Sequence, residues 1–159
     1  MSELKPGDRA PAFDLPTDGG GRARLSDYAG QQLVLYFYPK VDTSGCTSEA
    51  QGFSEKVEEF RAAGAQVLGV SKDSPKSHDK FKAKYDLALR LAADEDGGTV
   101  EAYGVWVEKS MYGRKYMGIE RATFLIDPLG AIQSVWRKVK VPGHVEAVLK
   151  AAQDHRQAS

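Results

Sequence analysis

The chain has 159 residues, 42% of them hydrophobic and 28% charged, which are proportions typical of a globular protein. This length fits one compact domain over residues 1–159, able to bury a core without a metal or a disulfide. The 22 basic and 22 acidic residues cancel, which argues against a protein that binds nucleic acid or an anionic membrane. The only cysteine is Cys46, which excludes an intramolecular disulfide and the class of small disulfide-rich secreted proteins.

No targeting or metal-binding pattern stands out. The N-terminus is polar and lacks the apolar core of a signal peptide, and the longest apolar run, residues 33–38, is far shorter than the stretch of about 20 residues that spans a bilayer. We therefore expect a cytoplasmic protein without membrane contacts, whose lone cysteine is a free thiol. The histidines are widely spaced, so neither a metal nor a cofactor is expected. They are His78, His144 and His155.

The first half of the chain predicts two buried strands joined by a helix. Residues 33–38 are continuously apolar and end at Pro39, a pattern typical of a strand buried on both faces. A loop over 40–45 leads into one long helix that ends at Gly64. The apolar positions of this helix recur at helical spacing, at Ala50, Phe53, Val57 and Phe60. Residues 66–70 predict the second strand.

Two further helices and a third strand are predicted next. Ser74 is an N-cap candidate and Pro75 suits the first helical position, so we expect a helix that extends toward Tyr85. A short helix is expected over 99–103, and residues 122–126 predict a strand. The aromatic residues between them are expected to lie in the core or at its rim. They are Trp106, Tyr112 and Tyr116.

The C-terminal part predicts a hairpin and a last helix. Residues 127–130 form a turn signal, 131–136 return as the hairpin partner, and Val145, Val148 and Leu149 indicate the helix. A right-handed βαβ unit followed by ββα is the layout of a thioredoxin-like α/β fold, with a central mixed β-sheet flanked by helices. The segment before residue 33 is expected to be an N-terminal extension.

Cys46 lies at the start of the first long helix, directly after a polar loop. The first turn of a helix carries unpaired N–H groups and the positive end of the macrodipole, and both favour a thiolate. The same loop supplies a hydroxyl at Thr43 and a glycine at Gly45. A lone cysteine can also be a small apolar core residue. The polar surroundings favour a reactive thiol instead.

The residues around Cys46 carry a family resemblance. Pro39, Thr43 and Cys46 match the Pro-x3-Thr-x2-Cys pattern of peroxiredoxins, and the sequence is most similar to the bacterioferritin-comigratory, or peroxiredoxin Q, subfamily. Further ordered matches follow at Pro11-Ala12-Phe13, Ser71-Lys72-Asp73-Ser74, Tyr103-Gly104-Val105-Trp106 and 121–127. The resemblance thus extends over most of the chain.

The resemblance implies a thiol-dependent peroxidase that reduces hydrogen peroxide and organic hydroperoxides. Cys46 would attack the peroxide and become a sulfenic acid. Thr43 would hydrogen-bond the sulfur or the peroxide, Pro39 would shield the pocket, and Arg121 would hold sulfur and peroxide oxygen with its planar fork. Glu49 follows Cys46 by one helical turn and could orient Arg121, or it could be an exposed helix carboxylate.

The sequence departs from the subfamily in its cysteine count. Many members carry a second, resolving cysteine five residues after the first, where this chain has Gln51, or near residues 81–83, where it also has none. Ser44 replaces the usual proline of the Thr-Pro-Gly-Cys segment. The sulfenic acid therefore has to be reduced by an external thiol: thioredoxin, glutaredoxin or glutathione. The subfamily also suggests a monomer.

Two alternatives remain on the same fold. A thiol–disulfide oxidoreductase usually needs a second cysteine three positions after the first, and position 49 is Glu. A thioredoxin-like interaction module without peroxidase turnover would not need the combination of Pro39, Thr43, Cys46 and Arg121. Peroxide consumption that depends on Cys46 distinguishes the peroxidase from both.

Overall fold

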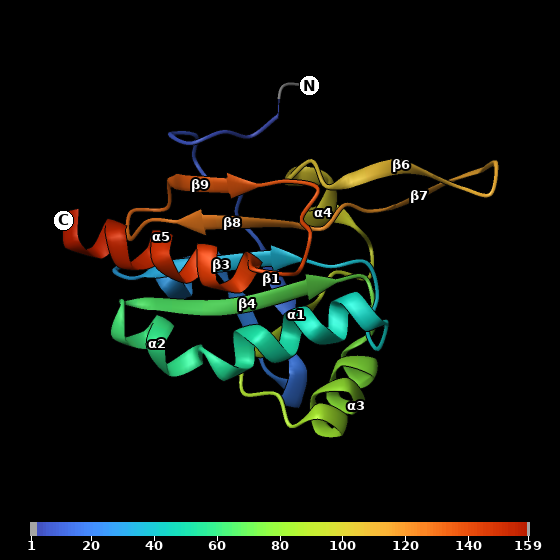
Figure 1. Cartoon of the computed structure of the whole chain (residues 1–159), viewed down its shortest axis with the longest axis horizontal. Helices are drawn as coiled ribbons and strands as arrows, with labels where there is room; N and C mark the ends of the chain where they lie inside the picture. The colour runs from blue at the N-terminus through green and yellow to red at the C-terminus, as the bar shows by residue number, and fades with distance from the viewer. Residues whose placement is uncertain (1–2, 159) are drawn as a thin grey trace.

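The centre of the fold is a five-stranded mixed sheet (Figure 1). The structure is a computed structural model that describes residues 3–158 and the side chains of residues 3–156. The strand order is β5-β4-β3-β8-β9, in which β3, β4 and β5 are parallel and β8 and β9 are antiparallel to their neighbours. The strands are β3 (Gln32–Phe37), β4 (Ala65–Ser71), β5 (Arg90–Ala93), β8 (Ala122–Ile126) and β9 (Ile132–Trp136). The predicted thioredoxin-like α/β class is confirmed.

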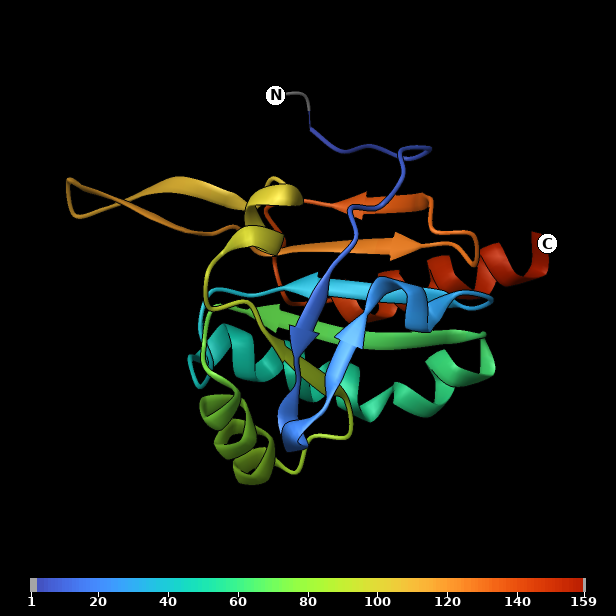
Figure 2. The ribbon, with the colours of Figure 1, turned by 180° about the vertical axis from the view of Figure 1, so that it is seen from behind.

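Side chains alternate across β3 because successive residues of a strand point to opposite faces. Leu33, Leu35 and Phe37 belong to one core cluster, and Val34 and Tyr36 belong to the other. The second cluster is covered by helices: α1 (Ser44–Glu55), α2 (Val57–Ala62), α3 (Pro75–Tyr85) and α5 (His144–Ala158). The first cluster is covered by α4 (Gly98–Ala102) and by the N-terminal hairpin of β1 (Asp14–Pro16) and β2 (Arg22–Arg24), visible in front of the sheet in Figure 2.

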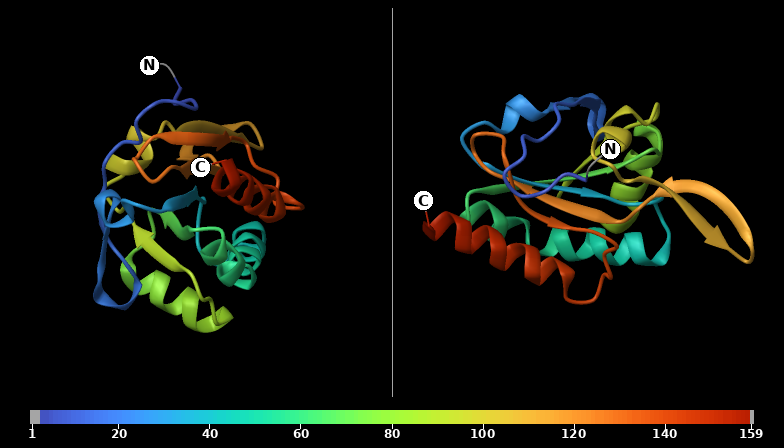
Figure 3. Two further views of the ribbon diagram at one scale, coloured as in Figure 1. Left: turned by 90° about the vertical axis from the view of Figure 1, so that its left-hand side faces the viewer. Right: turned by 90° about the horizontal axis from the view of Figure 1, so that it is seen from above.

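The N-terminal segment therefore closes one side of the core. Leu15 of β1 and Ala23 of β2 are buried against that face of the sheet. Two short 3-10 helices follow the strands of this segment: Asp18–Gly20 connects β1 to β2, and Leu25–Tyr28 lies between β2 and β3. The views in Figure 3 show the N-terminal segment on one side of the sheet and α1, α2 and α5 on the other.

One glycine fixes how α1 packs on the sheet. Tyr36 of β3 lies across β4, so that a Cβ atom on Gly69 would lie 2.7 Å from Tyr36 Cζ. On its other side the Tyr36 ring stacks on Phe53 of α1, with 4.6 Å between ring centroids. Only glycine at position 69 leaves room for this stack, which holds α1 against the end of the sheet where β3 runs into the Cys46 loop.

The predicted long helix that ends at Gly64 is wrong in one respect, since the structure has two helices there. Lys56 leaves helical geometry, with φ −103° and ψ 5°, and its N–H donates to Phe53 O at 3.1 Å. This i→i−3 bond tightens and ends α1, and α2 begins at Val57. The helix expected after Ser74 is found as predicted, with Ser77 N donating to Ser74 Oγ at 3.1 Å.

The sequence reading missed an exposed hairpin formed by β6 (Trp106–Met111) and β7 (Arg114–Ile119). It projects from the body of the protein in Figure 1. Tyr112 and Gly113 form its two-residue turn with φ of 52° and 77°, the positive values that such turns require. Tyr112 is 97% exposed, so its expected place in the core or at the rim is wrong. Among residues 3–158, no helix is both long and apolar enough to cross a membrane.

Candidate active site

Cys46 is the third residue of α1, just after the loop that leaves β3. Thr43 is the N-cap residue of this helix, with extended φ and ψ of −94° and 156°. Cys46 is 1% exposed and packs in the helix-covered core cluster. The sulfur therefore combines the first turn of a helix with a largely water-free environment.

Arg121 connects this helix to the opposite side of the site. It precedes β8, far from Cys46 in the sequence, and its Nη2 lies 3.4 Å from Cys46 Sγ. Its Nη1 donates to Glu49 Oε1 at 2.7 Å. Glu49 is fully buried, so the alternative of an exposed helix carboxylate is wrong. The structure thus brings Cys46, Glu49 and Arg121 into one cluster.

Burial sets the charge state of this cluster. Burial raises the pKa of Glu49 to about 7, although Arg121 acts in the opposite direction. Glu49 Oε2 has no hydrogen-bond partner among the described residues. Burial of this oxygen in its charged form is therefore unfavourable. Burial lowers the pKa of Arg121, but Glu49 and Cys46 outweigh it, and the net shift is upward. The guanidinium therefore stays positively charged next to the sulfur.

His144 adds no positive charge to the site. Burial, aided by Arg121, lowers the pKa of His144 to about 4. Its Nε2 lies 2.8 Å from Thr123 Oγ1, within the same buried region. The ring is therefore neutral at pH 7, and Arg121 remains the cation beside Cys46.

Gly45 makes room for the arginine. A Cβ atom at this position would lie 3.0 Å from Arg121 Nη2, the nitrogen that faces the sulfur. Any larger residue would push the guanidinium or the helix by a few tenths of an ångström. The sequence reading regarded Gly45 as a flexible loop residue, whereas the structure has it inside α1, in contact with Arg121.

Two aspartates that sequence reasoning missed anchor the loop before Cys46. Asp73 Oδ2 accepts from Val41 N at 2.9 Å and from Ser71 Oγ at 2.7 Å. Asp42 accepts from Lys84 Nζ at 2.7 Å and from the Tyr85 hydroxyl, both on α3. The only sequence signal for these anchors was the position of each aspartate next to a matched motif.

Two other predicted site residues lie in the segment between β3 and α1. Thr43 Oγ1 donates to Lys40 O at 3.0 Å, so its hydroxyl is bonded to the loop rather than to Cys46. Pro39 lies two residues after the end of β3 and is partly buried. Within the described chain, no group of three or more His, Cys, Asp or Glu side chains could hold a metal ion.

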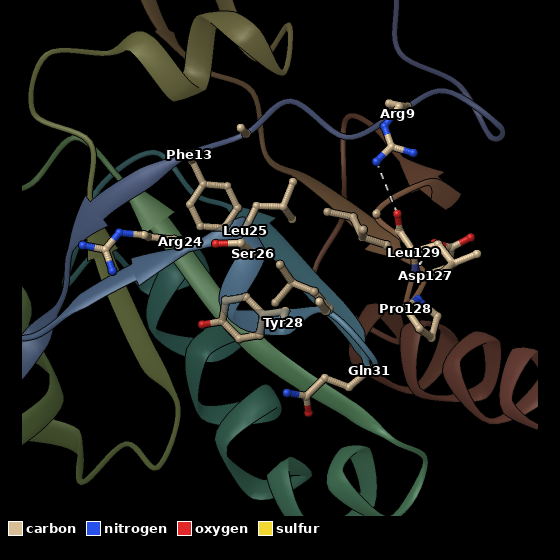
Figure 4. Close-up of a pocket in the computed structure, with 15 residues that line it drawn as sticks. Arg9, Phe13, Arg24, Leu25, Ser26, Tyr28, Gln31, Asp127, Pro128 and Leu129 are labelled. Carbon is tan, nitrogen blue, oxygen red and sulfur yellow. Dashed lines mark hydrogen bonds between the residues drawn. The ribbon is translucent and has the colours of Figure 1, made fainter.

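A cavity of about 490 Å³ lies elsewhere, at the other end of the sheet (Figure 4). Leu33 at the start of β3 and Ile126 at the end of β8 line it, whereas the Cys46 loop follows the end of β3. In Figure 4 the rings of Phe13 and Tyr28 lie on one side of the cavity. None of the predicted site residues lines it, so it is separate from the cysteine site.

Comparisons with known proteins show the family of this chain. The sequence model of the AhpC/TSA family matches residues 6–135 of the chain. The chain belongs to this family. Peroxiredoxin Bcp of Xanthomonas campestris is 50% identical over 148 residues, covering 92% of both chains. Peroxiredoxin Bcp of Escherichia coli strain K12 is 43% identical over 155 residues, covering 98% of this chain and 99% of that one.

Solved structures of peroxiredoxin Q proteins show the same fold. Xanthomonas campestris peroxiredoxin Q superposes with a TM-score of 0.87 at 49% identity, covering 91% of each chain. A cysteine-to-serine mutant of Xylella fastidiosa PrxQ superposes with a TM-score of 0.92 at 43% identity, covering 98% of this chain and 99% of that chain. This member of the AhpC/TSA family is therefore a peroxiredoxin and acts as a thiol peroxidase.

Proposed function

We propose that Cys46 is the nucleophile that reduces hydrogen peroxide and organic hydroperoxides. Its thiolate attacks one peroxide oxygen, the O–O bond breaks, and the second oxygen leaves as an alkoxide or hydroxide that takes up a proton. Cys46 is oxidised to a sulfenic acid and the peroxide is reduced to an alcohol or water. In support, the Xanthomonas campestris bacterioferritin comigratory protein, 48% identical with a TM-score of 0.86, has alkyl peroxide reduction activity.

The observation that carries the proposal is the position of Arg121 between Cys46 and Glu49. An ordinary cysteine is already a few per cent thiolate at pH 7, so complete ionisation speeds the attack by only about thirtyfold. The rest of the rate has to come from stabilising the negative charge that moves onto the leaving oxygen. One preorganised donor is worth roughly a hundred- to a thousandfold. Arg121, 3.4 Å from the sulfur, is in the place to supply it.

The other site residues have supporting roles in this proposal. Glu49 fixes the orientation of Arg121 through the 2.7 Å ion pair. Pro39 shields the sulfur from water at the end of β3. Thr43 hydrogen-bonds the incoming peroxide, for which its hydroxyl has to turn away from Lys40 O. These roles are inferred from where the three residues lie around Cys46.

An external thiol completes the cycle, because the chain has one cysteine. The candidates are thioredoxin, glutaredoxin and glutathione. The thiol of the reductant attacks the sulfenic sulfur of Cys46, so that water leaves and a mixed disulfide forms. A second thiol then reduces this disulfide and releases Cys46 as a thiol. A reducing compartment rich in such thiols is the cytoplasm, and we assign the enzyme there. We further propose that it acts as a monomer.

Intact-mass measurement after exposure to peroxide tests the proposal. Without thiol, the mass should rise by one oxygen and then by two, as Cys46 passes from the sulfenic to the sulfinic acid. With thiol, turnover should continue through a transient adduct and the sulfinic form should be suppressed. Cys46→Ser should abolish peroxide consumption. Sustained turnover by this variant would contradict the proposal, and disulfide-linked dimers as the main oxidised product would contradict the external thiol.

A further inference from the structure

The two faces of the β6–β7 hairpin carry different chemistry. Directly paired residues of an antiparallel hairpin share a face, so the register sorts the side chains. One face, here called the basic face, carries Val107, Lys109, Met111, Arg114, Tyr116 and Gly118. The opposite face carries Trp106, Glu108, Ser110, Lys115, Met117 and Ile119.

The charge on these two faces is unequal. On the opposite face, Lys115 Nζ pairs with Glu108 Oε1 at 3.7 Å. The basic face has two cations, Lys109 and Arg114, and no carboxylate. Within residues 3–158, neither of these two cations forms an ion pair. The basic face thus carries two cations and no carboxylate of its own.

The same face and the hairpin tip are also apolar. Met111 is 56% exposed, Tyr116 is 44% exposed, and Tyr112 at the tip is 97% exposed. Large apolar side chains are otherwise exposed, in the described chain, at Met117 on the opposite face and at the distant Leu129. Tyrosine and methionine next to an arginine are the residue types enriched where proteins bind proteins. The combination fits a partner with an apolar, acidic surface.

The basic face lies at the Cys46 end of the molecule. β7 ends at Ile119, two residues before Arg121, and in Figure 1 the hairpin extends beyond the edge of the sheet where β3 runs toward α1. Burial and Arg121 lower the pKa of Lys109 while Cys46 raises it, so Lys109 is within electrostatic range of both. A molecule bound on the basic face is therefore close to the sulfur.

We propose that the basic face of the β6–β7 hairpin and its tip dock an acidic dithiol protein of the thioredoxin class, which reduces oxidised Cys46. This inference rests on the proposed function. One thiol of the partner attacks the sulfenic sulfur, water leaves, and an intermolecular disulfide forms. The second thiol of the partner then attacks its own disulfide-bonded sulfur, which returns Cys46 as a thiol and leaves the partner oxidised. Since Cys46 is 1% exposed, the first turn of α1 has to open for this exchange.

Charge reversal on neighbouring residues tests the docking. Arg114 and Lys115 are adjacent but lie on the basic and the opposite face, respectively. The probe is a thioredoxin of net negative charge, and stopped-flow measurement gives the second-order rate constant for reduction of Cys46 sulfenic acid. Arg114→Glu should lower this rate constant by about five- to tenfold at low salt, and the loss should shrink as salt is added. The matched Lys115→Glu variant should change it by less than about twofold.

The apolar part of the surface has its own pair of variants. Tyr112→Ser should slow reduction by the same thioredoxin severalfold, whereas Leu129→Ser, which removes an 82% exposed leucine far from the hairpin, should not. For all four variants, oxidation by peroxide and reduction by dithiothreitol should match the parent protein. Equal effects of Arg114→Glu and Lys115→Glu, or equal effects on thioredoxin and dithiothreitol, would overturn the docking surface and leave the peroxidase intact.

Two other outcomes are distinguishable. If peroxide does not oxidise Cys46 in the parent protein, the proposed function fails first. If the hairpin variants instead change a concentration-dependent dimerisation, measured by sedimentation, the basic face binds a second copy of this chain and the dithiol partner is wrong.

Discussion

Arg121 reaches Cys46 Sγ with Nη2 at 3.4 Å while the other end of its fork is held by a buried carboxylate. The guanidinium is planar and its two terminal nitrogens are fixed relative to each other. Orientation of Nη1 by Glu49 therefore also orients Nη2 at the sulfur. The geometry makes the orientation of Arg121 at the sulfur depend on Glu49, whose side chain bonds the far nitrogen of the guanidinium.

Replacement of the fork tests this relationship. Arg121→Lys keeps the positive charge but cannot contact Glu49 and the sulfur with two coplanar donors. We expect oxidation of Cys46 by peroxide to slow by more than about tenfold, in line with the loss of one preorganised donor. Stopped-flow kinetics measure this step directly. Arg114→Lys, on the exposed hairpin, is the control and should leave the rate unchanged; parental kinetics in Arg121→Lys would assign the arginine a purely structural role.

Gly45→Ala separates stability from reactivity. Alanine is the better helix former, so the helix itself should not be weakened. The new Cβ atom would lie 3.0 Å from Arg121 Nη2 and should displace it from the sulfur. We expect the midpoint of thermal unfolding to stay within a few degrees of the parent while oxidation of Cys46 slows by about three- to tenfold. Ser48→Ala, at an exposed position of the same helix, is the control and should alter neither quantity.

Glu49 predicts an unusual dependence of stability on pH. Burial raises the pKa of Glu49 from an unfolded value of 4.5 to about 7, so the folded protein binds this proton more tightly than the unfolded chain. The contribution to stability is complete below pH 4.5 and is lost as the pH rises through about 7. Relative to the parent, Glu49→Gln should therefore gain roughly 1–3 kcal/mol of unfolding free energy between pH 5 and pH 8.

Urea unfolding at several pH values in that range measures the difference. Glu55→Gln replaces an exposed carboxylate of the same helix and should show no such trend. A Glu49→Gln variant whose stability relative to the parent is constant with pH would mean that Glu49 stays ionised in the folded protein throughout the range.

Local patterns predicted most of the interior of the fold, although they did not predict the buried strand β5. Residues 122–126 are uninterrupted apolar or β-branched positions and form β8 as expected, and Ser74-Pro75 marks the start of α3. The β6–β7 hairpin was missed because its strands lack the apolar–polar alternation of a half-buried strand, and most of their residues are exposed. The hairpin is exposed because of where the chain leaves the sheet, and a short segment of sequence does not reveal that point.

The site residues that belong to sequence motifs could be predicted. The contacts between residues of separate elements could not. Cys46 was identified from its place at a helix start and from the family resemblance, Arg121 from the resemblance alone, and the structure has them in contact. Burial of Glu49 depends on how α1 packs against the sheet, so sequence alone left its place open. The close approach of Gly45 to Arg121 joins residues from separate elements and could not be seen before the fold was known.

The anchor at Asp42 should control how often Cys46 becomes accessible. Asp42 joins the loop before α1 to Lys84 and Tyr85 of α3, and the sulfur can be alkylated only when the first turn opens. Asp42→Asn keeps a residue that tolerates the local φ of 59° but removes the charge. We expect alkylation of reduced Cys46 by iodoacetamide to become about two- to fivefold faster, the effect of losing one exposed ion pair. Asp154→Asn breaks the exposed Lys150 pair on α5 and should not change the rate. Alkylation of the urea-unfolded protein gives the intrinsic reactivity of the thiol. Equal alkylation rates in the folded parent and in folded Asp42→Asn would show that opening of the first turn does not depend on this anchor.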